Sequence, residues 1–344
     1  MKKKKIKALK YSSVIDFDNL SLKPEINLLK NSFSNYKDLV LLKNNSIRLI
    51  YENNNLNIEG ESDYSFGSSF DKIKYNINKK NDSYDFLTQI NLYSNPITIE
   101  PISYSKIKNK KSNLKLKGSY NKNKVRFNEI IYNEGSNFFK IKDLILNNKF
   151  KILNLNKVQA DYLNTNKKKN KFNIINNSVD YSLKGLSFDS YKLINDILLS
   201  DSDKNFLDIF DLKDGTKLNI NLNKVFLDEK NFSTNLSGEL IINNNKIHSF
   251  SLTSMFENNK RIKLDVKTLK NKQKITSFYS DNAEPFVKHF KFIKGFEGGK
   301  IDFYSVKENN TSNSTLSIFD FKVKEMPALT KLLSLASLQG MVDL

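Results

Sequence analysis

The chain lacks several residue types that carry particular kinds of chemistry. Among its 344 residues there is no Cys and no Trp, and there are only two His. The missing cysteines exclude disulfides, zinc–thiolate sites, iron–sulfur clusters and thiol nucleophiles. They leave the compartment open, because a cysteine-free protein suits the cytosol as well as the periplasm.

Arginine is also scarce, although the chain is strongly basic. Lys and Arg total 56 against 37 Asp and Glu, a formal charge of +19, yet Arg48, Arg126 and Arg261 are the only arginines. Asn makes up about one residue in seven, and a joint excess of Lys, Asn and Ile is typical of an AT-rich genome. A protein that recognises phosphate groups more often does so with arginine, whose guanidinium group can bind two oxygens at once. We therefore assign the charge mainly to composition and keep a polyanion site as the alternative.

No hydrophobic run is long enough to span a bilayer. The longest nearly apolar stretch, residues 332–342, is interrupted by Ser334, Ser337 and Gln339, whereas a spanning helix needs about 20 apolar residues. The start of the chain, Met1–Lys7, is similar to the n-region of a signal peptide, but no apolar h-region follows. The sequence as given therefore carries no export signal.

What the chain has in abundance is strict alternation of apolar and polar residues. A period of two with one apolar face is typical of antiparallel strands that are wet on one side. Short Asn-rich connectors between the runs suit hairpin turns. The pattern predicts a mostly β fold, a long antiparallel meander that forms an elongated, curled sheet. The clearest alternating runs are residues 73–77, 114–117, 218–223 and 262–266, and the clearest connectors are 53–55, 121–123, 243–245 and 257–259.

Three segments in the C-terminal half break the alternation and predict short helices. Residues 188–210 carry apolar side chains at helical spacing, with Asp189 as the expected N-cap. Residues 283–293 and 326–342 each carry a proline near the first turn, Pro285 and Pro327. Gly340 marks the expected end of the third helix.

None of the candidate phosphate-binding or metal-binding motifs has the residues and spacing that its chemistry requires. Gly295–Lys300 is one residue short of a phosphate-binding loop, and Ile301 stands where a magnesium-binding hydroxyl belongs. His248 and His289 have no partner ligand at metal-binding spacing. The lysine-rich runs 106–117 and 167–171 predict solvated hairpin tips. With no catalytic, metal or cofactor-binding residues to name, we expect a protein that is not an enzyme.

The C-terminal half resembles a known family in the order of its motifs. These are Leu183–Asp189, Ser280–Phe290, Gly298–Phe303, Leu316–Val323 and Met326–Gly340. Together they are similar to the AsmA-like C-terminal domain of YhdP-type proteins in the AsmA/TamB superfamily of bacterial envelope proteins. Glu284 and Met326 depart from the family pattern. The signature positions are Gly185, Phe188, Asp189, Asp281, Gly298, Gly299, Phe321, Pro327, Leu329, Leu332, Leu333, Ser337, Leu338 and Gly340.

The resemblance implies a domain division and a function. Residues 1–182 would be an antiparallel β-groove segment, and residues 183–344 the AsmA-like domain. The family implies a periplasmic protein, anchored to the inner membrane and reaching toward the outer membrane, whose apolar groove shields phospholipid acyl chains during transport. It implies no cofactor and no specific nucleic acid. Candidate groove-lining residues are Leu114, Leu116, Leu218, Ile220, Leu222, Ile262, Leu264 and Val266.

Two alternatives stay open at this stage. The apolar face of the strands could fill a closed sandwich core instead of lining a groove, since alternation alone fits both. The protein could be a basic polyanion binder or a purely structural β-scaffold instead of a lipid carrier. We also expect the chain to be a fragment of a longer protein, whose membrane association lies in a segment missing here.

Overall fold

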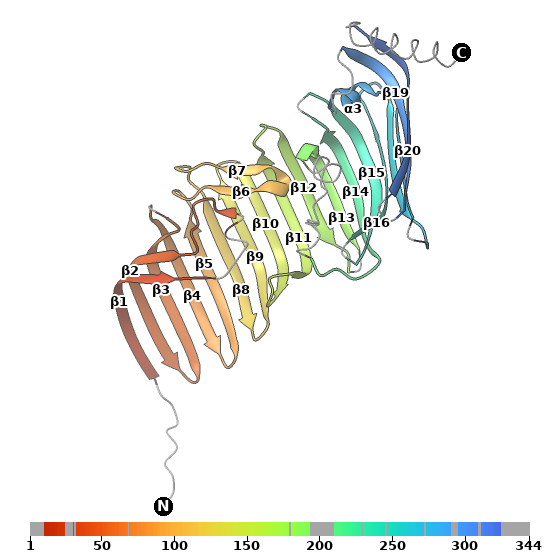
Figure 1. The fold of residues 1–344 in the computed structure, drawn as a ribbon. Coiled ribbons are helices and arrows are strands. Elements are labelled where there is room, and N and C mark those ends of the chain that lie inside the picture. The colour runs from red at the N-terminus through yellow and green to blue at the C-terminus, as the bar shows by residue number, and fades with distance from the viewer. Residues whose placement is uncertain are drawn as a thin grey trace, which may run out of the picture. The chain divides into compact units, whose positions relative to one another are not determined.

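The computed structural model describes most of the chain, in two compact units. The described residues are 10–24, 30, 32–67, 69–178, 180–192, 210–228, 230–244, 246–271, 273–289, 295–308 and 311–324. The first unit comprises residues 1–218 with 242–246, and the second comprises 219–241 with 247–344. Strands dominate the described residues of both units, so the prediction of a mostly β protein is confirmed (Figure 1).

The first thirteen strands belong to the first unit, and the remaining seven begin at β14, in which the boundary between the units falls. The strands are β1 (Lys10–Leu22), β2 (Val40–Glu52), β3 (Asn55–Ser65), β4 (Asp71–Lys80), β5 (Ser83–Asn91), β6 (Ile97–Ile99), β7 (Tyr104–Lys106), β8 (Asn113–Asn121), β9 (Lys124–Glu134), β10 (Asn137–Asn147), β11 (Ile152–Leu163), β12 (Lys169–Asn176), β13 (Tyr181–Asp189), β14 (Thr216–Phe226), β15 (Phe232–Asn243), β16 (Lys246–Met255), β17 (Arg261–Thr268), β18 (Lys274–Ser280), β19 (Phe296–Glu308) and β20 (Thr311–Val323).

The strands form an antiparallel meander, as predicted. In the first unit each strand pairs with the next one along the chain, from β1 to β13, with one exception. Strand β5 pairs with β8, and the intervening β6 and β7 pair with each other in a separate small sheet. In the second unit the same order runs from β16 to β20. Eighteen strands belong to one sheet, which does not close on itself.

Asparagine supplies the tight turns between strands, as the connectors predicted. A two-residue hairpin turn needs positive φ angles, which Asn adopts more readily than most residues. Asn53 and Asn54 link β2 to β3 with φ of 51° and 63°. Asn81, Asn244 and Asn259 also have positive φ, between 49° and 60°. The Asn-rich composition is therefore used locally to hold hairpins.

Irregularities in pairing keep the apolar side chains in phase across the first unit. β8 pairs Lys117 with Glu129 and then Gly118 with Phe127, so Asn128 is the extra residue of a bulge. Asp143 in the neighbouring β10 has a φ of 49°. As a result, apolar residues three apart in sequence lie on one face, where a regular strand would place them on opposite faces. The sequence pattern did not predict these irregularities in the strands.

The second unit packs a short helix, α3 (Glu284–His289), against its sheet. Ala283, Val287, Phe296 and Ile301 are fully or almost fully buried and form a cluster with the ring of Phe286. The Phe286 ring makes an edge contact with Phe278 of β18 at 4.7 Å between centroids. Apolar residues of α3 therefore cover part of one face of this sheet.

The helices differ from the prediction of about three. Within the described ranges the helices with printed bounds are α3 and one 3-10 helix, η1 (Glu100–Ile102), and residues 30, 32, 191 and 192 are also helical. The first helix was predicted from residue 188, but Phe188 and Asp189 end strand β13, where the Phe188 ring contacts Phe172 of β12 at 5.4 Å between centroids and the Asp189 backbone donates to the Asn170 side chain at 2.7 Å. The rest of that segment beyond residue 192, and the predicted helix 326–342, lie outside the described residues. The predicted helix 283–293 is confirmed over Glu284–His289.

Candidate functional site

One face of the first unit carries four parallel rows of side chains that run across the strands. Residues paired directly in an antiparallel sheet point to the same face, so the pairing defines each row. We call these rows together the apolar face. Row one is Tyr11, Tyr51, Leu56, Lys79, Tyr84, Tyr120, Val125, Leu146 and Ile152. Row two is Ser13, Leu49, Ile58, Ile77, Phe86, Gly118, Phe127, Leu144 and Leu155.

The next two rows continue the apolar face toward the other end of the strands. Row three is Ile15, Ile47, Gly60, Tyr75, Thr88, Leu116, Ile130, Ile141, Val158, Ile174 and Leu183. In row four the Ser62 hydroxyl donates a hydrogen bond to the side-chain amide oxygen of Asn45. Row four is Phe17, Asn45, Ser62, Ile73, Ile90, Leu114, Tyr132, Phe139, Ala160, Phe172 and Gly185.

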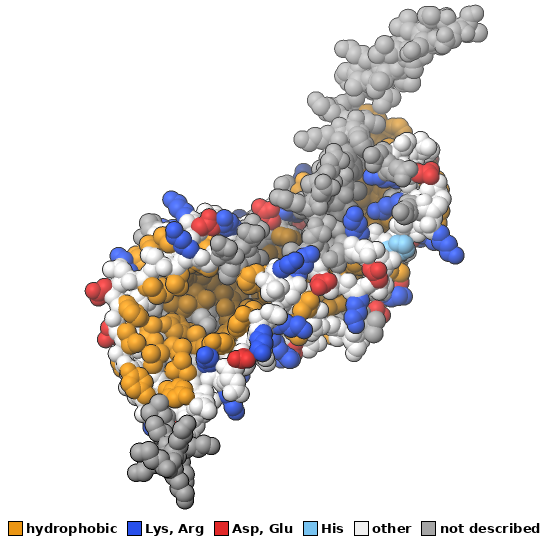
Figure 2. Space-filling model, turned by 60° about the horizontal axis from the view of Figure 1, so that its bottom comes forward, with side chains coloured by type: hydrophobic (Ala, Val, Ile, Leu, Met, Phe, Trp, Pro, Cys, Tyr) orange, Lys and Arg blue, Asp and Glu red, His pale blue; other side chains and the backbone are white. Residues whose placement is uncertain are grey.

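The apolar face is open in the described part of β2 to β5. Every member of rows one to three in these four strands is half-buried, and none is fully buried. Closing a second sheet over these rows would bury such residues almost completely. The main contacts of these strands are with their hydrogen-bonded neighbours. Figure 2 shows hydrophobic side chains gathered on this hollowed face.

The opposite face of the sheet in the first unit is mostly polar and carries charges of both signs. Lys140 pairs with Glu129 at 2.6 Å, and Arg126 pairs with Asp143 at 3.0 Å. The Lys74 ammonium beside Glu61 holds the pKa of that carboxyl below its ordinary value. The charges are interspersed rather than gathered into one basic patch, which gives little support to the polyanion alternative.

Residues 92–112 lie over one end of the apolar face, and we call them the cover segment. It contains β6, η1 and β7. The ring of Tyr104, 1% exposed, makes edge contacts with Tyr132, Phe139 and Tyr162 at 5.0 to 5.9 Å. The Tyr162 hydroxyl donates to the Ile102 carbonyl at 3.0 Å. The cover segment therefore closes the strand ends beyond row four (Figure 1).

A buried lysine organises the cover segment, contrary to the prediction of a solvated tip. Lys106 is 1% exposed, and its ammonium donates to the carbonyls of Leu92 and Asn95. Burial lowers the pKa of Lys106. The sequence signals that break the strand pattern here are Pro96 and Pro101, but nothing in them identifies Lys106 as the buried member of its lysine run.

Two buried carboxylates tie the cover segment to the sheet. Asp71 accepts hydrogen bonds from the Ser94 backbone and the Asn95 amide, each at 2.8 Å. Glu134 pairs with Lys110 and accepts from the Tyr104 hydroxyl at 2.7 Å. Burial acts to raise the pKa of Glu134, but the hydrogen bonds from Lys110, Tyr104 and Asn137 outweigh it and hold that pKa below its ordinary value.

Two glycines of the apolar face make room for aromatic rings. A Cβ added at Gly60 would lie 2.3 Å from the ring of Tyr75. A Cβ added at Gly118 would lie 2.1 Å from the Arg126 carbonyl oxygen and 2.8 Å from the ring of Phe86. The rings spread across the glycines and keep rows two and three free of gaps.

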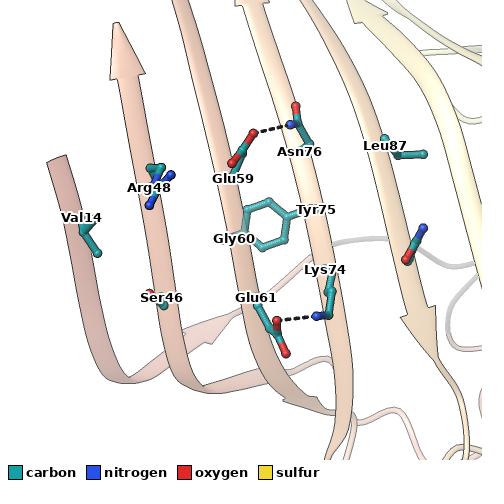
Figure 3. A pocket seen from close by; sticks show the side chains of 11 residues that line it. Val14, Ser46, Arg48, Glu59, Gly60, Glu61, Lys74, Tyr75, Asn76 and Leu87 are labelled. Carbon is teal, nitrogen blue, oxygen red and sulfur yellow. Dashed lines mark hydrogen bonds and ion pairs between the residues drawn. The ribbon is translucent and has the colours of Figure 1, made fainter. Parts of the chain in front are cut away.

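A surface hollow lies on the polar face, and Gly60 and Tyr75 of row three also contribute to its lining. It has a volume of about 520 Å³, is wide open, and is lined by residues of β1 to β5. Figure 3 shows Asn76 donating to Glu59, at 2.9 Å, and Lys74 paired with Glu61, at 2.7 Å. These polar groups are already paired with one another, and we assign no chemistry to the hollow.

The predicted groove-lining residues fall in both units. Leu114 and Leu116 lie in rows four and three of the apolar face and are half-buried. In β17, Ile262, Leu264 and Val266 share a face, on which Leu264 pairs with Leu252 and with Phe278. Val266 and, in β14, Leu222 are buried, at 5% and 1% exposure, while Leu218 and Ile220 are half-buried.

The described signature residues have structural roles. A Cβ at Gly185 would lie 2.4 Å from the Lys171 carbonyl oxygen, and Asp189 accepts from the Tyr191 backbone at 3.1 Å. In the second unit Gly298 and Gly299 have φ of 65° and 75°. Asp281 accepts from the backbone of Arg261, and Phe321 stacks on Phe296 at 5.1 Å. The signature positions outside the described residues are Pro327, Leu329, Leu332, Leu333, Ser337, Leu338 and Gly340.

Neither a metal site nor a membrane-spanning helix is found in the described ranges. No group of three or more His, Cys, Asp or Glu side chains there could hold a metal ion, and none of their helices has the length and hydropathy to cross a bilayer. Comparison with protein-family models, curated proteins and solved structures finds no match. The apolar face is therefore the candidate site, argued from its own geometry.

Proposed function

We propose that the first unit is a lipid-shielding groove, in which the apolar face holds phospholipid acyl chains away from water. The observation that carries this proposal is the half-burial of rows one to three in β2 to β5, on a face over which the described strands place no second sheet. A contiguous apolar surface that remains accessible to water usually marks a binding site. A protein of this kind performs no reaction and needs no cofactor.

The energetics favour acyl chains as the occupant. Each methylene kept out of water is worth about 0.8 kcal/mol, so a chain of about 15 methylenes accounts for roughly 12 kcal/mol. The face is deep enough for such a chain. Tyr120 in row one and Leu114 in row four are six residues apart on β8. At about 3.3 Å per residue they are about 20 Å apart, more than the roughly 15 Å of half a bilayer core.

The resemblance to AsmA-like envelope proteins extends the proposal beyond the geometry. On that basis the protein belongs to the periplasm, anchored to the inner membrane, and contributes to lipid transport and to the outer-membrane barrier. The candidate lining residues of the second unit would extend the same role. These assignments rest on the motifs of the C-terminal half.

Lipid extraction tests the proposal directly. The full chain, purified without detergent after incubation with phospholipid vesicles, should carry phospholipid through gel filtration, detected by mass spectrometry. A β-protein with a filled core, such as an immunoglobulin domain, is the control for carry-over. Recovery of no more lipid than the control would overturn the proposal.

A further inference from the structure

Row one differs from the deeper rows in its chemistry. Four of its residues are tyrosines, Tyr11, Tyr51, Tyr84 and Tyr120, whereas row two has none. Row one is also the row nearest the tight hairpins, at the strand ends opposite the cover segment. We call it the tyrosine margin. Tyrosine is favoured where an apolar surface meets water, because its ring is apolar and its hydroxyl is polar.

Two of the hydroxyls at the tyrosine margin, those of Tyr51 and Tyr120, bond to hairpin residues. The Tyr51 hydroxyl donates to the Asn54 side chain at 3.0 Å, and the Tyr120 hydroxyl donates to the Lys122 carbonyl at 3.2 Å. Both acceptors belong to turns that follow the strands. The rings therefore lie on the apolar face with their polar ends directed to its edge, as at the boundary between hydrocarbon and headgroups.

One cation lies within this margin. Lys79 is the only charged side chain in the four rows, and it pairs across the strands with Leu56 and Tyr84. Its ammonium lies 5.5 Å from the centre of the Tyr84 ring. Among the described residues, no carboxylate forms an ion pair with it. A half-buried cation without a counter-ion, beside apolar rows, favours an anionic ligand.

We infer that the tyrosine margin is a headgroup site, at which Lys79 binds the phosphate of an anionic glycerophospholipid. The inference rests on the proposed function and specifies its ligand. The acyl chains then run from row one toward the cover segment, which closes the far end of the face. An anionic lipid is preferred over a zwitterionic one because the latter carries its own cation and leaves Lys79 little to neutralise.

The test compares two matched lysine variants of the full chain. Lys79→Met keeps the aliphatic stem and removes the charge. Lys117→Met makes the same change on the polar face, where Lys117 is exposed and pairs across the strands with Leu87. Each protein is incubated with vesicles of equal parts phosphatidylglycerol and phosphatidylcholine, and the bound lipids are extracted and quantified by mass spectrometry. Circular dichroism and thermal melting check that both variants are folded.

The lipid bound to the wild type and to Lys117→Met should be enriched in phosphatidylglycerol over phosphatidylcholine. In Lys79→Met the ratio of bound phosphatidylglycerol to phosphatidylcholine should be about five-fold lower, while the total bound lipid is retained. Equal enrichment in Lys79→Met and Lys117→Met would overturn the inference. So would displacement of the preference by inorganic phosphate alone, which would indicate a free-anion site. Lipid bound by the wild type without headgroup preference refutes only the headgroup site, whereas no bound lipid refutes the proposed function itself.

Discussion

A carboxylate placed on the apolar face should block lipid binding, and the chain offers a matched pair of positions for this test. Ile130 and Ile131 are neighbours on β9, and both are half-buried. Ile130 lies in row three, paired with Leu116 and Ile141. Ile131 points to the polar face, where it pairs with Lys115 and Lys140. Ile130→Asp and Ile131→Asp therefore make one chemical change on two faces.

The expected effects differ by orders of magnitude. Moving from Ile to Asp in a hydrocarbon environment costs about 3–4 kcal/mol, since Ile contributes roughly −0.5 and Asp roughly +3 kcal/mol on the membrane-insertion scale. A lipid seated against residue 130 should therefore bind at least a hundred-fold more weakly to Ile130→Asp. Ile131→Asp gains nearby ammonium groups and should bind lipid like the wild type.

The assay is lipid transfer between donor and acceptor vesicles, together with quantification of co-purified lipid. Thermal melting checks that Ile130→Asp is folded, because Ile130 also packs against the buried cluster of Leu144, Leu146 and Leu155. Protonation provides an internal control, because a carboxyl against acyl chains has a raised pKa and becomes neutral as the pH falls. Ile130→Asp should therefore regain part of its lipid binding below about pH 5. Equal lipid loss in both variants, or a larger loss in Ile131→Asp, would refute an apolar face that holds lipid.

Three further predictions concern the scaffold of this face. Gly118→Ala should lower the stability by about 1–3 kcal/mol in thermal melting, because the new methyl overlaps the neighbouring strand, whereas Gly135→Asn, at an uncrowded turn with φ of 59°, should change it little. Glu134→Gln should loosen the cover segment by about 1–3 kcal/mol, seen as faster proteolysis there. Since the folded pKa of Glu134 is lowered from 4.5, the wild-type contact is stable above that pH and weakens as the pH falls below it, while Glu134→Gln should show no such dependence. In this Trp-free chain, Tyr120→Trp should be quenched best by lipids brominated near the headgroup, and Leu114→Trp by lipids brominated near the chain end; the reverse order would contradict the proposed lipid orientation.

The sequence was sufficient to predict the strands and their turns. Strict alternation at positions such as 114–117 is a local signal, and Asn at 53 and 54 is a local turn signal, so neither depends on distant partners. Local signals also mark α3, through Pro285. They place the start of the next helix too early, because Phe188 and Asp189 still belong to strand β13, whereas Tyr191 and Lys192 are helical and the Asp189 carboxylate accepts from the Tyr191 backbone.

Other features depend on contacts that the sequence does not specify. The Asn128 bulge makes Phe127 and Ile130 share a face, and it is visible only when neighbouring strands are paired. The burial of Lys106 requires three carbonyl groups to converge on its ammonium. Alternation alone likewise did not separate a closed core from an open face, and the exposure of rows one to three in the described part of β2 to β5 favours the open face there.

Pairing between sequence neighbours has a consequence for how such a protein changes over generations. Strands β2 to β4 each pair with the strand that follows along the chain. Gain or loss of one hairpin therefore leaves the pairing of the remaining strands unchanged, and their apolar side chains still point to the same side of the sheet. At about 4.8 Å between strands, each hairpin adds or removes roughly 10 Å of apolar face. The reach of the binding surface can therefore evolve in discrete steps, and an internal duplication can lengthen the molecule without redesigning its interior.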